Sequence, residues 1–213
     1  MRAGDAVRWM RSVPSIVWLL LAVALVPELL LSGADMGLWG NLRWRGWAFH
    51  YGGFWAALLD DWRPNYSAQP YAMFFTYGFL HAGPVHFLVN AITLLSLSPP
   101  LAESEGTLRF LLVFVASLFG GAAVFALLSP VPAPMIGMSG ALFGLAGALL
   151  AREYADRAAL SLALWPVIQT VLGLVAMNVV LWWAMHGHLA WQTHLGGFLA
   201  GWVVTSVPAR FRR

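Results

Sequence analysis

Four polar side chains lie in apolar segments of this chain, where a polar group is costly unless it meets water or another polar group. Ser139 lies in the stretch IGMSGALFG, and His86, Asn90 and His194 lie in two other apolar stretches. An imidazole such as that of His194 titrates near neutrality and can take the proton of a serine hydroxyl. The set predicts a serine nucleophile held inside a membrane. A serine that only allows helices to pack is the alternative.

Counting along the chain places these side chains at one depth. The count runs to the residue at which each apolar stretch is expected to end: Ser139 precedes Arg152 by 13 residues, His86 precedes Pro99 by 13, and His194 precedes Pro208 by 14. Asn90 follows His86 by one helical turn and shares its face. We therefore expect the four side chains to converge.

A helix that begins at Ser139 would stabilise an oxyanion through its unpaired N–H groups and the positive end of its dipole. His86 and Asn90 can donate side-chain hydrogen bonds to the same oxygen, and each such donor typically contributes about 10²–10³ in rate. No Asp or Glu lies at this depth in the stretch that carries His194. A third member of a catalytic triad is therefore not evident.

Small residues indicate how the serine and the histidine could meet. Small-xxx-small ridges let two helix backbones approach closely. Such ridges follow both Ser139 and His194: Gly140, Gly144 and Ala148 on one helix, Gly197 and Gly201 on the other. We expect these helices to pack together, although the ridges fit a purely structural serine equally well.

Two further residues could support the site. His81 is five residues before His86, about 140° around a helix, so the pair does not fit one zinc ion and we interpret His81 as structural support. Phe143, one turn after Ser139, occupies a usual core position from which it can also pack on the ring of His194.

Composition places these residues in a membrane protein. The 213 residues are 60% hydrophobic and 10% charged, with a mean hydropathy of +0.72, whereas soluble domains are about 45–50% apolar and about 25% charged. All 12 basic residues are arginine, and many lie near segment ends, which does not fit the basic stripe of a nucleic-acid surface. The chain has no cysteine, and metal binding by His186 and His188 in a short outer loop is not favoured.

Six apolar stretches predict an all-α polytopic membrane protein with six spans: 16–31, 73–97, 108–128, 139–151, 160–185 and 190–207. Residues of about 32–70 form a long outer loop. Its aromatic-rich segment 46–59 is too short to span and is expected to lie in the membrane interface. We interpret Glu28, near the outer end of the first span, as a carboxylate that reaches the headgroups.

The fourth stretch is short, since 13 residues cover about 20 Å of a hydrocarbon core of about 30 Å. The helix would therefore begin at Ser139 below the outer surface, beneath irregular backbone at the proline-rich segment 130–134, which implies a wet pocket. Both termini are rich in arginine, and the positive-inside rule places them in the cytoplasm. The site would then open toward the outer side.

Three motifs together resemble those of the rhomboid intramembrane serine proteases. They are GMSG at 137–140, HAGPVHFLVN at 81–90 and HLGGFLAG at 194–201. They occur in family order on the second, fourth and sixth of six spans, and the similarity covers nearly the whole chain. Residues 1–213 are therefore expected to form a single rhomboid-type membrane domain.

The resemblance implies that Ser139 is the nucleophile and His194 the general base, with His86, Asn90 and the Ser139 N–H in the oxyanion hole. It implies that no cofactor or metal is needed and that the fifth span, or the loop above it, acts as the substrate gate. It also implies that the substrates are single-span membrane proteins, cut in or near the membrane at small residues. A bacterial inner-membrane location is expected. Supporting positions are His81, Gly137, Gly140, Phe143, Gly197 and Gly201.

The chain departs from the family pattern at two places. PYAMFF at 70–75 stands where a Trp-Arg pair often precedes the second span, while Trp44 and Arg45 lie much earlier, so the first loop is expected to be anchored differently. The cytoplasmic Glu-x-x-x-Gly pattern appears as Glu103 to Gly106, one residue short.

Two other functions stay open. A non-catalytic rhomboid-like protein would bind transmembrane clients and use Ser139 and His194 only for packing, but the intact pair argues against it. A small transporter is weakly supported, because the spans contain neither a chain of acidic residues nor an inverted repeat.

Overall fold

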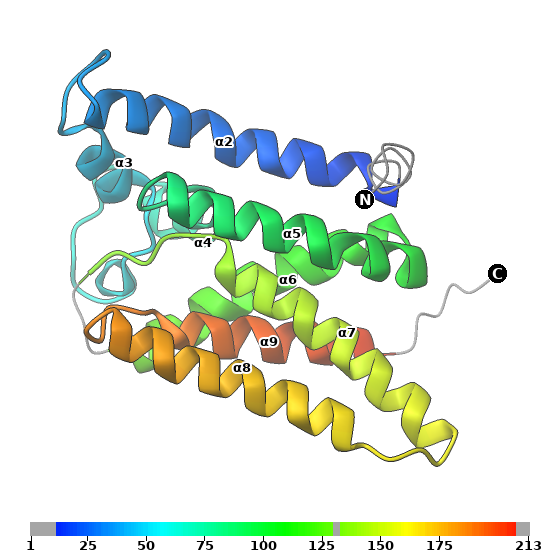
Figure 1. Ribbon diagram of the computed structural model, residues 1–213. Coiled ribbons are helices and arrows are strands. Elements are labelled where there is room, and N and C mark those ends of the chain that lie inside the picture. Colours follow the sequence, from blue (N-terminus) through cyan, green and yellow to red (C-terminus); the bar gives the residue numbers. More distant parts are fainter. Residues whose placement is uncertain (1–11, 130–132, 208–213) are drawn as a thin grey trace.

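The computed structural model describes residues 12–129 and 133–207, and this part of the chain is built from helices (Figure 1). The predicted all-α fold is confirmed. The β-structure among the described residues is one bridge between Phe54 and Met135. The α-helices are α2 (Ser15–Asp35), α3 (Trp44–Gly52), α4 (Gln69–Thr76), α5 (Pro84–Glu105), α6 (Thr107–Leu128), α7 (Ser139–Ala159), α8 (Trp165–Ala184) and α9 (Trp191–Ser206), with 3-10 turns η1 (Ala56–Leu59) and η2 (Tyr77–Phe79).

Four helices, α2, α5, α6 and α8, are long and apolar enough to cross a membrane. Helices α7 and α9 correspond to the predicted fourth and sixth spans, but α7 ends in charged turns and α9 has only 16 residues. The arginine-rich termini, on which the predicted orientation depends, and most of the 130–134 segment lie outside the described residues. Residues 133–138, which precede α7, are irregular as expected.

Helices α6, α7 and α9 form the most closely packed part of the bundle. A Cβ added to Gly197 would overlap the carbonyl oxygen of Gly140, and one added to Gly201 would overlap that of Gly144. The backbones of α7 and α9 therefore touch, as the small-residue ridges predict.

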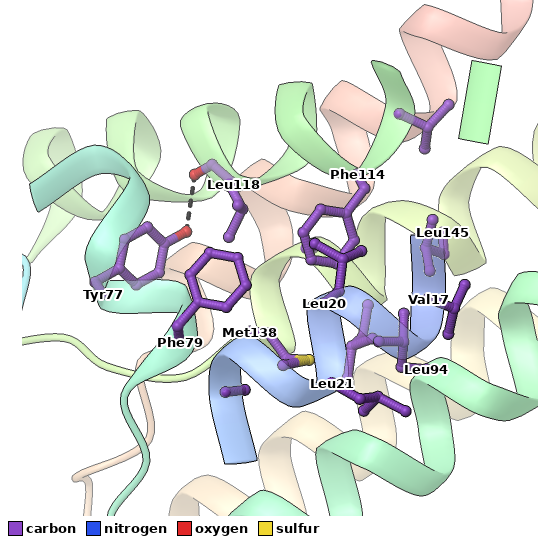
Figure 2. Close-up of a cluster of buried hydrophobic side chains, with 14 of the residues drawn as sticks. Val17, Leu20, Leu21, Tyr77, Phe79, Leu94, Phe114, Leu118, Met138 and Leu145 are labelled. Atoms are coloured by element: carbon purple, nitrogen blue, oxygen red, sulfur yellow. Dashed lines mark hydrogen bonds between the residues drawn. The ribbon is translucent and has the colours of Figure 1, made fainter. Parts of the chain in front are cut away.

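A buried apolar cluster joins α2 and α5 to this group (Figure 2). Val17 of α2, Leu94 of α5 and Leu145 of α7 are members of this cluster. The hydroxyl of Tyr77 donates a 2.8 Å hydrogen bond to the carbonyl of Leu118, which ties η2 to α6. The segment just before α5 is thus fixed to the centre of the bundle.

The predicted second span, 73–97, begins in the wrong place. Helix α4 ends at Thr76, residues 80–83 form an irregular link, and α5 begins at Pro84. Gly83 has a φ of +131°, which favours glycine, and a proline suits the first position of a helix because its missing N–H is not needed there. The unbroken apolar composition conceals this break.

The predicted end of the second span is also wrong. Helix α5 continues through Pro99 and Pro100 to Glu105, because packing against neighbouring helices can hold a helix whose prolines remove single hydrogen bonds. Gly106, at a φ of +85°, ends it. Pro99 was therefore not a true depth marker for His86, which lies in the first turn of α5.

Helix α7 begins at Ser139 as predicted but is longer than the predicted 139–151. It continues to Ala159, where Arg157 pairs with Glu153 one turn earlier. A nitrogen of the Arg152 guanidinium lies 2.6 Å from a carboxylate oxygen of Glu105, at the end of α5. Among the described residues, Glu105 therefore forms the ion pair between α5 and α7, and Glu103, the glutamate of the family pattern, does not. The charges predicted to end the helix instead stabilise its last turns.

Helix α8 lies at the edge of the bundle (Figure 1) and is sparsely packed. Val167 is its buried residue, whereas large apolar side chains such as Leu172, Val179 and Trp183 are exposed. In a bilayer this surface faces lipid.

The interpretation of Glu28 as a headgroup-facing carboxylate is wrong. Its side chain is buried, and it accepts hydrogen bonds from Arg45 of α3 and from Ser32. Burial lowers the pKa of Arg45, but hydrogen bonds and charge attraction from Glu28 and Asp35 outweigh it and raise that pKa above its usual value. A buried carboxylate needs such a partner, and α3 supplies it.

Candidate active site

Ser139 and His194 form a hydrogen-bonded pair at the starts of two helices. Ser139 is the first residue of α7 and His194 lies in the first turn of α9. Serine Oγ and imidazole Nε2 are 2.9 Å apart, and His194 is buried. The close approach of Gly197 to Gly140 brings these helix starts together. With the proton on Nδ1, Nε2 accepts the hydrogen bond from the serine hydroxyl.

Two contacts fix the imidazole of His194. One is on a face of the ring, and the other is at Nδ1, the nitrogen that does not contact Ser139. The ring of Phe143 stacks on the imidazole with 4.2 Å between centroids and 8° between planes. Nδ1 lies 2.6 Å from Oδ1 of Asn178, a residue of α8. Both contacts restrict the rotation of the ring.

The sequence reasoning did not identify Asn178, although a signal was present. It is an amide in an otherwise apolar stretch, and it follows Trp165, the first residue of α8, by 13 residues. Counted from residue 160, where the sequence predicts this stretch to begin, the distance is 18 residues, so the depth count places Asn178 at the level of Ser139 and His194 only when the start of α8 at Trp165 is known. The third polar group is an amide on α8, whereas the sequence prediction considers acids in the last span.

The side-chain donors of His86 and Asn90 lie next to the backbone of Gly137, two residues before Ser139. A Cβ added to Gly137, whose φ is +104°, would lie 2.8 Å from Nε2 of His86 and 3.6 Å from Nδ2 of Asn90. Nδ1 of His86 accepts a 3.3 Å hydrogen bond from the Ala82 N–H, so the neutral ring carries its proton on Nε2. A glycine leaves room for the ring of His86 here and allows the positive φ.

The amide nitrogen of Asn90 is buried and has no hydrogen-bond partner among the described residues. Leaving a buried donor unpaired costs about 1–3 kcal/mol. Such a group in a native protein calls for an explanation, and a ligand oxygen bound at this point would satisfy it.

The ring of His81 contacts the ring of His86. The His81 ring is buried and meets that of His86 edge-on at 5.0 Å, while the His81 carbonyl accepts a 2.6 Å hydrogen bond from Arg45. Burial, followed by the charge of His86, lowers the pKa of His81 to about 3. The residue is therefore neutral and supports the position of His86.

The site gathers the first turns of α5, α7 and α9, which carry His86, Ser139 and His194. Helix N-termini present unpaired N–H groups and partial positive charge. Three such ends at one place make the site suited to a developing anion.

A cavity of about 480 Å³ lies between α8 and α9. Phe143, Leu174, Trp182 and Phe198 are among the apolar residues that line it. Asn178 and His194 provide polar atoms in the same wall, so an apolar group bound there would lie beside the imidazole.

The described residues contain no group of three or more His, Asp or Glu side chains that could hold a metal ion. His186 and His188 lie in the link between α8 and α9 and do not join His194.

Comparison with known proteins identifies relatives. A family model described as Rhomboid domain matches residues 68–211, about two thirds of the chain. Among curated proteins, RHOMBOID-like protein 1 of Arabidopsis thaliana is 32% identical over 130 residues, which is 61% of this chain and 32% of that protein. Rhomboid-related protein 3 of Homo sapiens is 27% identical over 149 residues, 65% of this chain and 36% of that protein.

A bacterial protein is similar over much the same length. Rhomboid protease GluP of Bacillus subtilis (strain 168) is 29% identical over 122 residues, 57% of this chain and 23% of that protein. The matched region spans less than half the length of each of these three relatives.

Proposed function

The chain belongs to the rhomboid family of integral membrane proteins, and we propose that it is an intramembrane serine endopeptidase with Ser139 as nucleophile and His194 as general base. The observation that carries this proposal is the 2.9 Å hydrogen bond between Ser139 Oγ and His194 Nε2. A serine is a weak nucleophile unless a base in this position takes its proton.

In the first half of the reaction, Oγ of Ser139 attacks the carbonyl carbon of the scissile peptide and its proton passes to Nε2 of His194. The carbonyl oxygen becomes an oxyanion. When the C–N bond breaks, the imidazolium returns the proton to the leaving amine, and an acyl-enzyme ester remains. In the second half, His194 takes a proton from water, the hydroxide attacks the ester, and Ser139 is regenerated with its proton.

The oxyanion is stabilised by His86 Nε2, Asn90 Nδ2 and the backbone N–H of Ser139. The unpartnered amide of Asn90 and the Nε2 proton of His86 support this assignment. These donors are in place before substrate arrives, so they need little reorganisation as the charge develops.

The substrate class follows from the family. Rhomboid proteins act on membrane proteins within the bilayer, and we infer that this one cleaves single-span proteins at small residues in or near their membrane segment. We place the chain in the bacterial inner membrane, with both termini in the cytoplasm, residues 32–70 as the outer loop and residues 1–213 as one domain. No cofactor is required.

A fluorophosphonate probe tests the proposal, because it reacts only with an activated serine. The purified chain in detergent or bicelles is expected to be labelled and to cleave a model single-span substrate. Ser139→Ala is expected to abolish both, whereas Ser161→Ala, in the link after α7, is the matched control. Cleavage by the Ser139→Ala variant would disprove the mechanism.

The main alternative is a non-catalytic rhomboid-like protein that binds transmembrane clients. It predicts no labelling of the wild type and co-purification of a client equally by the wild type and Ser139→Ala. The hydrogen bond between Ser139 and His194, together with the unpaired donor of Asn90, favours the enzyme.

A further inference from the structure

We propose that Asn178 of α8 is the positioning residue for His194, so that Ser139, His194 and Asn178 form a triad that spans three helices. This inference rests on the proposed protease function. Its basis is the 2.6 Å contact between Asn178 Oδ1 and His194 Nδ1, on the side of the imidazole opposite Ser139.

The orientation of the Asn178 amide follows from its second contact. Its nitrogen Nδ2 donates a 2.9 Å hydrogen bond to the carbonyl oxygen of Leu174, a group that can only accept. The other amide atom, Oδ1, is therefore the one that faces His194. Oδ1 can only accept, so Nδ1 of His194 carries a proton.

This proton position determines the reactivity of the other nitrogen. A neutral imidazole with its proton on Nδ1 has a free lone pair on Nε2, which is the nitrogen beside Ser139. The same Oδ1 remains an acceptor when the ring becomes an imidazolium during the reaction. Asn178 thus does what the aspartate does in a serine protease triad, through a neutral amide that costs less to place in a membrane than a carboxylate.

The triad also depends on where α8 lies. Ser139 and His194 lie on helices whose backbones touch, whereas α8 has only Val167 buried. A shift of α8 away from α9 would separate Asn178 from His194 and leave the serine pair intact. The activity of the site is therefore linked to the position of this one helix.

The test compares kcat and KM for a model single-span substrate, across pH, in the full chain and its variants. Asn178→Ala is expected to lower kcat about tenfold, the rate equivalent of one ordinary hydrogen bond, with KM little changed. Thr170→Val is the matched control, since Thr170 is exposed on α8 and bonds only the backbone four residues earlier. It should behave as the wild type.

The pH profile of kcat for Asn178→Asp is a measurement that a purely structural role of Asn178 would leave unchanged. This variant keeps the acceptor and adds negative charge, which favours the imidazolium, so the acid limb of the kcat profile should move to higher pH. Among the described residues, His86 of α5 is a titratable group whose charge also acts on His194. His86 is unchanged in every variant.

The outcomes separate this inference from the proposed function. A wild type that is neither labelled nor active defeats both. An active wild type together with Asn178→Ala at the wild-type kcat, or Asn178→Asp with an unmoved acid limb, overturns the role of Asn178 and leaves the protease assignment in place. A tenfold loss in the first variant and an upward shift in the second support the triad.

Discussion

The guanidinium group of Arg45 holds the carboxylate of Glu28 through two hydrogen bonds of 3.0 Å, one from each terminal nitrogen. The same side chain reaches Asp35 and the carbonyl oxygen of His81 over 2.6 Å each. Arg45 therefore joins α3 and the end of α2 to the segment that leads into α5.

Removal of Arg45 is predicted to destabilise the fold. Arg45→Ala would leave Glu28 buried without a cation, which typically costs about 3–5 kcal/mol. Thermal unfolding in a fixed detergent measures the effect, with the exposed Arg43→Ala as control. The double variant Glu28→Gln/Arg45→Met should be more stable than Arg45→Ala alone. Equal stability of the two single variants Arg45→Ala and Arg43→Ala would contradict the anchoring role.

Gly197→Ala is predicted to separate the serine from its base. The new Cβ would overlap a carbonyl oxygen of α7, and backbone cannot move aside as a flexible side chain can, so α7 and α9 must part. Such overpacking costs about 1–3 kcal/mol, and a misplacement of about 1 Å can cost about 10² in rate. Activity and thermal stability are measured beside Gly173→Ala, whose Cβ would meet nothing within 4 Å. Full activity of Gly197→Ala would refute the close approach.

Asn90→Ala is predicted to lower activity without lowering stability. The variant removes a proposed donor to the oxyanion, so kcat should fall by about 10²–10³ while KM changes little. It also removes a buried donor that lacks a partner, so the unfolding temperature should hold or rise. Thr93→Val on the exposed side of α5 is the control. If stability fell in parallel with activity, Asn90 would be a structural residue.

The buried His81 predicts a specific dependence of stability on pH. Its pKa is about 3 in the fold and about 6.5 in an unfolded chain, so below pH 6.5 the unfolded state binds a proton that the folded state does not. Stability should therefore decrease as pH falls from 6.5 toward 3, with a slope of up to about 1.4 kcal/mol per pH unit. His81→Phe should flatten this slope. An unchanged slope would mean that His81 is protonated in the fold.

Helix types and most helix starts could be predicted from the sequence, because apolar composition and turn residues are local signals. The start of α7 at Ser139 follows from the irregular glycine and proline segment before it. The break before Pro84 was missed within a continuous apolar run, although the Gly83-Pro84 pair was a local signal for it. The true end of α7 depends on ion pairs that become visible only when both partners are on one helix face.

The polar network was harder to predict than the helices. Ser139 and His194 were found because both carry chemistry that an apolar segment does not need. The pairing of Glu28 with Arg45 depends on how α3 folds back onto α2, which no spacing in the sequence encodes. Predicting Asn178 needs the start of α8 at Trp165, five residues after the start that the sequence predicts, and a wider set of residue types than acids.

The contrast between the touching backbones of α7 and α9 and the sparse packing of α8 has a consequence for how this protein can change over evolutionary time. Substitutions at the glycine contacts alter the distance between Ser139 and His194, so under the proposed function most of them would be eliminated by selection. Those on the outer surface of α8 leave that distance untouched. Under the proposed function, new substrate preferences would therefore accumulate on α8, as long as the amide that faces the imidazole is kept.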